Sequence, residues 1–290
     1  MNSIQNQFEE FCAESQLFSH AADIDYLGID ISGGSTLPVQ FKLYYGNSYS
    51  QKASHPLIDY LSSKNMIRYV TLVRDLQIPG RGRFDIGLKN RSDDHMESLF
   101  AWLSEKVPFY KKAEEEIRKL SQIRVTEREG FRHAGLYFLG MISQEDAIEV
   151  LKCHYFLRMC EHPDVLHKNI SYMDSVYLEE LARSGSKEFA LLSECAARLL
   201  SVCGGHLWMA GTDYAEGKAS KYKIYIKNPM EIYEGLAQVL GRAEYAPELS
   251  DFLMEVEKWQ SDNPAFSCEG FAVCLTSDGE WSVNFYNVMI

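Results

Sequence analysis

A polar β-strand that carries lysines on one face recurs along the chain, and it constrains the fold more than any other feature. Its clearest copy, Ser220–Lys227, sets Lys221, Lys223, Tyr225 and Lys227 against Tyr222, Ile224 and Ile226. Alternation with a period of two places these two sets on opposite faces of a sheet. The apolar face needs a cover. The other face carries ammonium groups, which are costly to bury unless an anion meets them.

The chain reads as a helix followed by a β-hairpin, five times over. The predicted strand pairs are Asp23–Ser32 with Val39–Tyr45, Ile67–Asp75 with Arg83–Lys89, Arg132–Met141 with Ala147–Arg158, His206–Asp213 with Ser220–Lys227, and Cys268–Thr276 with Trp281–Val288. The predicted helices are Asn2–Gln16, Pro56–Lys64, Asp93–Glu105, Phe109–Ser121, Asp174–Arg183, Glu188–Cys203, Met230–Arg242 and Pro247–Trp259. Ser277–Gly279 gives the last pair a strong hairpin-turn signal.

Helices that separate hairpins, rather than parallel strands, indicate an antiparallel sheet with helices on one face. Ten strands without an obviously protected edge favour closure into a barrel. We therefore predict an α+β fold, a ten-stranded antiparallel β-barrel surrounded by helices, formed by residues 1–290 as a single domain. The apolar strand faces would pack against the helices, and the lysine-bearing faces would line a solvated chamber.

Charge and composition exclude several classes of function. The net charge of −12 makes nucleic acid or an anionic membrane an improbable partner, so any anion site has to be a local group of lysines. The sequence contains neither a signal peptide nor a membrane-spanning run of apolar residues. Seven cysteines without a CxxC pair are typical of reduced thiols, which predicts a cytoplasmic protein.

Three local patterns suggest other chemistry, and each has a simpler interpretation. Asp93–Glu97 looks like the DDxxE motif of magnesium-binding isoprenoid synthases, but it fits a helix start capped by Ser92 or Asp93, and no second acidic motif accompanies it. The spacing of Cys160, His162 and His167 matches no standard zinc site. The glycine pairs at 33–34 and 204–205 are not followed by the GK[ST] of a phosphate-binding loop.

Five short segments together resemble the ABBA aromatic prenyltransferases, particularly the dimethylallyltryptophan synthases and the enzymes that prenylate cyanobactin peptides. They are Asp30–Ser32, Phe41–Tyr44, Leu151–Phe156, Thr212–Tyr225 and Glu280–Tyr286. The chain departs from the family pattern at Asp30, where glutamate is usual, at His154, where tyrosine is usual, and at Lys221, where arginine is usual.

The resemblance implies a barrel of five αββα repeats and a transferase. An enzyme of this kind moves a dimethylallyl or geranyl group from an allylic diphosphate to an indole or phenol, free or within a peptide, in natural-product biosynthesis. The reaction is an electrophilic aromatic substitution. It needs cations for the leaving diphosphate, aromatic rings around the carbocation and a base for the acceptor. No cofactor is required, although Mg²⁺ can accompany the diphosphate.

The resemblance also implies roles for particular residues. Diphosphate ligands would be Lys42, Lys152, His154, Lys221 and Lys223, with Arg83 and Lys89 as further candidates on the second hairpin. Tyr44, Tyr225 and Tyr286 would shield the carbocation. Asp30 would be the base, and Asp25 is the second candidate, placed on the opposite face by strict alternation.

A different class of function remains open, a non-catalytic barrel that binds an anionic or aromatic small ligand. A catalyst should lose turnover on Asp30→Asn and still bind diphosphate, whereas a binding protein should be indifferent to that substitution.

Overall fold

The structure of the chain is a computed structural model. It describes residues 4–19, 21–33, 39–46, 54–74, 82–123, 131–132, 135–144, 147–156, 159–160, 174–184, 186–216 and 220–290. All structural statements below concern these residues.

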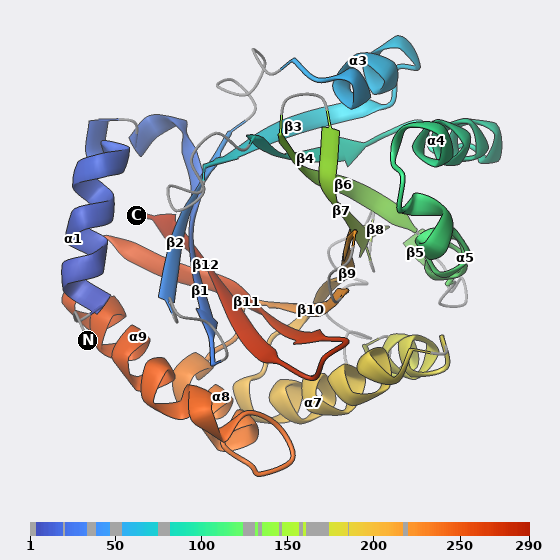
Figure 1. Cartoon of the computed structure of the whole chain (residues 1–290). Helices are drawn as coiled ribbons and strands as arrows, with labels where there is room; N and C mark the ends of the chain where they lie inside the picture. Colours follow the sequence, from blue (N-terminus) through green and yellow to red (C-terminus); the bar gives the residue numbers. More distant parts are fainter. Residues whose placement is uncertain are drawn as a thin grey trace.

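Ten strands form a closed antiparallel barrel, as predicted (Figure 1). They are β1 (Ile24–Ser32), β2 (Val39–Tyr45), β3 (Ile67–Arg74), β4 (Gly82–Leu88), β6 (Leu136–Gln144), β7 (Ala147–Phe156), β9 (His206–Ala215), β10 (Lys221–Lys227), β11 (Phe266–Thr276) and β12 (Trp281–Met289). Around the barrel their order is β1-β12-β11-β10-β9-β7-β6-β4-β3-β2, and β2 pairs with β1. Closure leaves no free sheet edge between these strands.

Helices surround the barrel on its outside (Figure 1). They are α1 (Ile4–Ser15), α3 (Pro56–Ser63), α4 (Asp93–Lys106), α5 (Tyr110–Ser121), a helix over 174–182, α7 (Lys187–Cys203), α8 (Ile232–Leu240) and α9 (Ser250–Asp262). The short 3₁₀ turns η1 (Leu17–Ser19) and η2 (Ala21–Asp23) lead into β1, and η3 (Pro247–Leu249) leads into α9.

The core lies between the outer face of the barrel and the helices. Phe41, which points outward from β2, packs against Phe8 and Phe11 of α1 with ring centroids 5.4 Å apart in both cases. On the other side of the barrel, Tyr222 of β10 meets Phe189 of α7 at 5.1 Å. This burial of the outward faces leaves the polar faces of the same strands to form the lumen, as the alternation predicted.

The third hairpin differs from the prediction. The strand expected over Arg132–Met141 begins instead at Leu136. Two short strands, β5 (Phe131–Arg132) and β8 (Met159–Cys160), pair with each other in a separate two-stranded sheet. The prediction merged these two segments because they lie only a few residues apart in the sequence and no turn signal separates them.

The acidic motif at Asp93 is a helix start, as expected. The Ser92 side chain accepts a hydrogen bond from the backbone N–H of His95, and Asp93 and Asp94 lie in the first turn of α4. Carboxylates at this position interact favourably with the unpaired N–H groups of the helix end.

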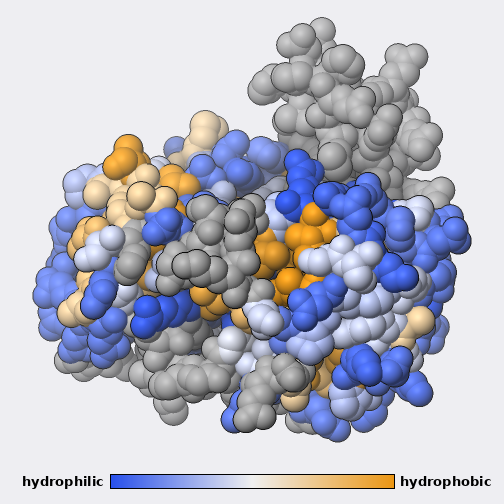
Figure 2. Space-filling view, turned by 90° about the horizontal axis from the view of Figure 1, so that it is seen from above, coloured by the Kyte–Doolittle hydropathy of each residue, from blue (hydrophilic) through white to orange (hydrophobic). Residues whose placement is uncertain are grey.

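Seen from above, the outer surface is mostly hydrophilic, with an apolar patch near the middle of this face (Figure 2). None of the described helices is both long and apolar enough to cross a membrane.

Candidate active site

The lumen contains a cluster of buried ion pairs centred on Asp213. Strand β9 lies between β7 and β10, and Asp213 is the register partner of Lys152 on one side and of Lys221 on the other. The Nζ atoms of Lys152 and Lys223 donate hydrogen bonds to Oδ2 of Asp213 over 3.0 and 2.5 Å. The sheet register therefore brings lysines from two hairpins to one carboxylate.

Two further ion pairs lie in the same lumen. Lys42 pairs with Asp30 on the neighbouring strand, and Arg83 pairs with Asp85 at 3.3 Å. The described lumen thus holds the basic side chains Lys42, Arg83, Lys152, Lys221 and Lys223 against the carboxylates Asp30, Asp85 and Asp213. With all of these ionised, two positive charges remain in excess, which favours an anionic ligand.

Burial and charge shift the protonation of this cluster. Burial, and next the charge of Arg83, lower the pKa of Lys152 to about 7, although Asp213 opposes the shift. Burial and the charge of Lys223 lower the pKa of His154 to about 3, so this imidazole is neutral near pH 7. Burial would raise the pKa of Asp30, but the charges of Lys42 and Lys221 outweigh it and hold that pKa below its ordinary value.

Three tyrosines from three hairpins lie in a row beside the ion pairs. The ring of Tyr286 lies between those of Tyr44 and Tyr225, with centroids 5.8 Å away from each. The Arg83 guanidinium lies 5.4 Å from the Tyr44 ring centroid, and a 3.0 Å hydrogen bond joins the Tyr225 hydroxyl to Nε2 of His154. Burial raises the pKa of all three phenols, which therefore stay neutral and offer π faces to a cation.

Several of these groups line a cavity of about 350 Å³. Its charged and polar lining consists of Asp25, Thr71, Arg83, Asp85 and His154, and its apolar and aromatic lining of Tyr26, Tyr44, Tyr69, Phe138, Trp208, Met209, Tyr225 and Tyr286. The volume falls within the range of roughly 300–1,000 Å³ typical of small-molecule sites. Lys42, Lys152, Lys221 and Lys223 do not line the cavity. The first, second and fourth of them belong to the buried ion pairs, and Lys221 feels the charges of Asp30 and Asp213.

Glycines in the lumen make room for the large side chains of the neighbouring strands. A Cβ atom on Gly211 would lie 2.6 Å from Cδ2 of His154, and one on Gly28 would lie 2.8 Å from Cε2 of Tyr44. Contacts this short do not occur between real side chains without a shift. The positions of His154 and Tyr44 therefore depend on glycine in the adjacent strand.

A β-bulge recurs near the start of the first strand of each hairpin. The extra residues are Asp25, Arg68, Tyr137, Trp208 and Glu269. All of them lie at the end of the barrel opposite the hairpin turns. A bulge turns two successive side chains toward one face, which is how both Asp25 and Tyr26, and both Trp208 and Met209, come to line the cavity.

The bulge at Asp25 changes the assignment of the candidate base. Strict alternation placed Asp25 on the outer face, yet the structure places it in the cavity wall. Burial raises its pKa. Asp30 does not line the cavity and is held by Lys42. Of the two aspartates on β1, Asp25 is therefore the one that lines the cavity.

The structure gathers most of the residues predicted for the site. Into the lumen or the cavity wall it places Asp30, Lys42, Tyr44, Arg83, Lys152, His154, Lys221, Lys223, Tyr225 and Tyr286. Lys89 is the exception, because β4 ends at Leu88 and the Lys89 side chain is exposed. Its predicted place on the lumen face was wrong, since the strand stops before the alternation reaches it.

The sequence prediction missed several residues of the site. Asp85 shares a face with Arg83 by simple alternation, so its position was available from the pattern. The position of Asp213 was not available from the pattern, because its contacts with the lysines come from the pairing of β9 with β7 and β10. The positions of Trp208 and Phe138 depend on bulges, which leave no signal in the periodicity.

No group of three or more His, Cys, Asp or Glu side chains in the described part of the chain is arranged to hold a metal ion. Of the residues weighed for a zinc site, His162 and His167 lie outside the described residues, as does the side chain of Cys160.

Solved structures share this architecture. The 6-dimethylallyltryptophan synthase from Micromonospora olivasterospora, in complex with DMASPP and Trp, aligns with a TM-score of 0.53 at 13% identity, over 90% of this chain and 80% of its own. AnaPT from Neosartorya fischeri gives 0.55 at 11% identity, over 91% and 77%. The NotF prenyltransferase gives 0.54 at 10% identity, over 92% and 81%.

The fold is that of the aromatic prenyltransferases. No protein-family model matches the sequence, and no curated protein does so either. At these identities the likeness establishes the prenyltransferase barrel, and the activity has to be inferred from the chemistry of the lumen.

Proposed function

We propose that the protein transfers a prenyl group, dimethylallyl or geranyl, from an allylic diphosphate to an aromatic acceptor in natural-product biosynthesis. The acceptor would be an indole or a phenol, as a free small molecule or within a peptide. One observation carries the proposal: a cavity walled by Tyr44, Tyr225 and Tyr286 adjoins a lumen in which basic side chains outnumber carboxylates. An allylic diphosphate needs both of these surroundings.

The diphosphate would bind at the charged side of the cavity. Arg83 lines the cavity and would contact it directly, and His154 would donate a hydrogen bond to a phosphate oxygen. Lys152 and Lys223 would exchange part of their interaction with Asp213 for the phosphate oxygens. As the allylic C–O bond breaks, its electron pair moves onto the diphosphate, and these cations stabilise the growing negative charge.

The allyl cation would form against the tyrosine rings. Their π faces stabilise a cation and exclude water, which would otherwise capture it. The electron-rich ring of the acceptor then forms a bond to the allylic carbon, and the proton at the attacked ring position leaves to a base. Asp25, in the wall of the cavity with a raised pKa, suits that role.

Substitution of Asp25 tests the assignment of the base. We expect Asp25→Asn to lower kcat about a hundredfold, the lower end of the range for general bases, because cleavage of the C–O bond rather than proton removal should limit the rate. The affinity for inorganic pyrophosphate should be unchanged. Asp30→Asn is the comparison, and it should alter pyrophosphate affinity because it frees Lys42. Equal loss of turnover in the two variants, with unchanged pyrophosphate affinity in both, would contradict the assignment to Asp25.

The low pKa of Lys152 predicts proton uptake on diphosphate binding. Free protein loses this proton as the pH rises through about 7, whereas a bound anion favours the charged ammonium. Binding of inorganic pyrophosphate at pH 8 should therefore take up a proton, and at pH 6 the ammonium is already charged. Calorimetry at pH 8 in buffers of different ionisation enthalpy measures the uptake. Lys152→Met should reduce it, and an identical uptake in that variant would refute the prediction.

One observation favours a second candidate, a barrel that binds a small ligand without reaction. Asp30, Asp85 and Asp213 already neutralise most of the lumen cations, so the chamber is less basic than its lysines alone would make it. The two candidates differ in whether a covalent product forms.

Mass spectrometry of reaction mixtures distinguishes these candidates. The protein is incubated with dimethylallyl or geranyl diphosphate and a panel of indoles, phenols, aromatic amino acids and peptides, with and without Mg²⁺. We expect a prenylated product from at least one pair and none when the diphosphate is omitted. Absence of a product from every pair, in a protein that still binds pyrophosphate, would favour the binding barrel.

A further inference from the structure

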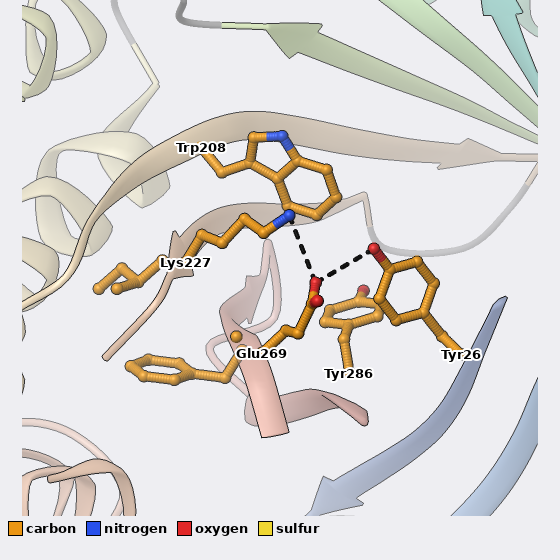
Figure 3. A pocket seen from close by; sticks show the side chains of 8 residues that line it. Tyr26, Trp208, Lys227, Glu269 and Tyr286 are labelled. Carbon is orange, nitrogen blue, oxygen red and sulfur yellow. Dashed lines mark hydrogen bonds and ion pairs between the residues drawn. The ribbon is translucent and has the colours of Figure 1, made fainter. Parts of the chain in front are cut away.

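One of the recurrent bulges places a carboxylate at the mouth of the barrel, which is the end opposite the hairpin turns. Glu269 is the extra residue between Cys268 and Gly270 of β11. A Cβ atom at position 270 would lie 2.5 Å from the carbonyl oxygen of Ile226, so only glycine allows the neighbouring strand this close. The bulge and the glycine together direct the Glu269 side chain toward Tyr26 across the mouth (Figure 3).

Glu269 belongs to a cage that already holds a cation. The Nζ atom of Lys227 lies 3.3 Å from Oε2 of Glu269 and 5.0 Å from the ring centroid of Trp208. The Tyr26 hydroxyl donates a 3.3 Å hydrogen bond to the same carboxylate oxygen (Figure 3). A carboxylate beside an indole face is a combination by which proteins bind ammonium groups, and here the ammonium belongs to the chain itself.

The cage is continuous with the proposed active site. Tyr26, Trp208 and Tyr286 line both the large cavity and a hollow of about 10 Å³ beside Glu269. A hollow of this size accommodates a group as small as a water molecule or an ammonium ion. The Tyr286 ring belongs to the proposed carbocation shield, so a group bound in the cage lies one aromatic side chain away from the reacting centre.

The ion pair contributes little to folding. The side chains of Lys227 and Glu269 are 29% and 36% exposed, so water screens the pair and reduces its contribution to stability. Because Lys227 is this exposed, an incoming cation can replace it at Glu269 while the lysine turns into solvent. A cation that enters with the acceptor would keep the same contacts with Glu269 and Trp208.

We propose that Glu269 and Trp208 bind a protonated primary amine carried by the aromatic acceptor, and that Lys227 occupies this place until the acceptor arrives. The proposal rests on the proposed function for the identity of the ligand as an acceptor. It selects arylalkylamines, including amino acids and peptides that present a free ammonium close to the ring. Acceptors without the charge would bind in the large cavity alone.

The two partners of the ion pair should respond in opposite directions. Glu269→Gln removes the carboxylate and should weaken binding of a cationic acceptor. Lys227→Met removes the internal competitor and should strengthen it. A purely structural ion pair would give two variants with the same defect, so the opposite signs separate recognition from stability.

Matched ligands provide the probe. Tryptamine is compared with N-acetyltryptamine, and tyramine with N-acetyltyramine, by calorimetry at pH 7 without diphosphate and by product formation with dimethylallyl diphosphate. In the indole pair or in the phenol pair, we expect the amine to bind about tenfold more tightly than its acetylated form. This is the effect of one favourable charge contact of about 1.4 kcal/mol. Glu269→Gln should abolish this difference, and Lys227→Met should enlarge it several-fold. Both variants should unfold at the temperature of the unmodified protein.

Each outcome has a separate meaning. Equal binding of amines and acetylated forms, loss of binding in both variants, or no binding of either amine at millimolar concentration overturns the cage. Preference for the amine leaves the cage in place, and if no pair of the wider acceptor and diphosphate panel gives a prenylated product either, the proposed transferase is contradicted. A prenylated product formed without any preference for the amine supports the proposed transferase and contradicts the cage.

Discussion

Replacement of Lys223 by methionine is expected to lower kcat/KM for prenyl transfer by about 10³-fold, the upper part of the effect of removing one charged or donor group from a developing anion. Lys223 is 3% exposed and its Nζ atom lies 2.5 Å from Asp213, so its charge is barely screened by solvent. In the proposed reaction this charge faces a diphosphate that becomes more negative as the C–O bond breaks. Methionine keeps the length and apolar character of the side chain but not its charge.

Folding and binding can be separated in this variant. Asp213 retains its hydrogen bond from Lys152, so no carboxylate is left alone in the lumen, and thermal unfolding should change little. The affinity for inorganic pyrophosphate should fall at least about tenfold, the effect of losing roughly 1.4 kcal/mol. Lys112→Met, at an exposed position of α5, is the matched control and should leave activity unchanged. Wild-type turnover in Lys223→Met would contradict the role given to the lysine cluster.

Most of the fold could be predicted from the strand pattern, because the alternation within each strand is consistent with closure of all the strands into a barrel. Lys221, Lys223 and Tyr225 alternate with Tyr222 and Ile224, and the structure places the first set in the lumen and the second under the helices. Each of the five hairpins repeats this division. A sequence with one apolar face in every strand has few arrangements that cover all of them, and a barrel inside a ring of helices is one.

The details of the site depend on features with no period. The bulges that turn Asp25, Trp208 and Glu269 toward the mouth each insert one residue, so every side chain before them changes face relative to strict alternation. Strict alternation also fails at Lys89, which it assigned to the lumen, because the strand ends one residue earlier. The mouth of the barrel is therefore the region that sequence reasoning described least well.

The other contacts that could not be predicted from the sequence come from pairing between strands that lie far apart in the chain. Asp213 meets Lys152 because β7 pairs with β9, although the two residues are 61 positions apart in the chain. The alternation of the strands predicted a lysine-rich lumen. The structure shows instead a lumen in which three aspartates hold the cations in place and leave only part of their charge for a ligand.

Asp213→Asn is expected to destabilise the protein by about 3–5 kcal/mol near pH 6, the usual effect of removing one partner from a buried ion pair. The substitution leaves the Lys152 and Lys223 ammonium groups close together without a carboxylate. Urea unfolding measures the loss. Glu180→Gln, which breaks an exposed pair with Arg183, is the matched control and should change stability by about 0–0.5 kcal/mol.

The pH dependence of this loss follows from Lys152. Its pKa is already lowered to about 7, and removal of Asp213, which opposes that shift, lowers it further. The folded variant can then release the Lys152 proton, which the unfolded chain keeps up to its ordinary pKa of about 10.5. Between this lower pKa and about 7 the folded variant has released the proton that the folded unmodified protein still holds, so the stability of the variant rises with pH relative to that of the unmodified protein, and above about 7 both rise alike. The destabilisation should therefore be smaller at pH 8.5 than at pH 6.

Pyrophosphate makes the same variant a test of the anion site. With Asp213 gone, the lumen has a larger excess of positive charge, and a bound diphosphate supplies the missing negative partner for Lys152 and Lys223. At one pyrophosphate concentration, a hundredfold above the Kd of the variant, the ligand should therefore stabilise Asp213→Asn by about 2.7 kcal/mol, and the unmodified protein, which binds it less tightly, by less. If pyrophosphate stabilised neither protein, the lysines would be structural counter-ions of the three aspartates, and the diphosphate site would have to lie elsewhere.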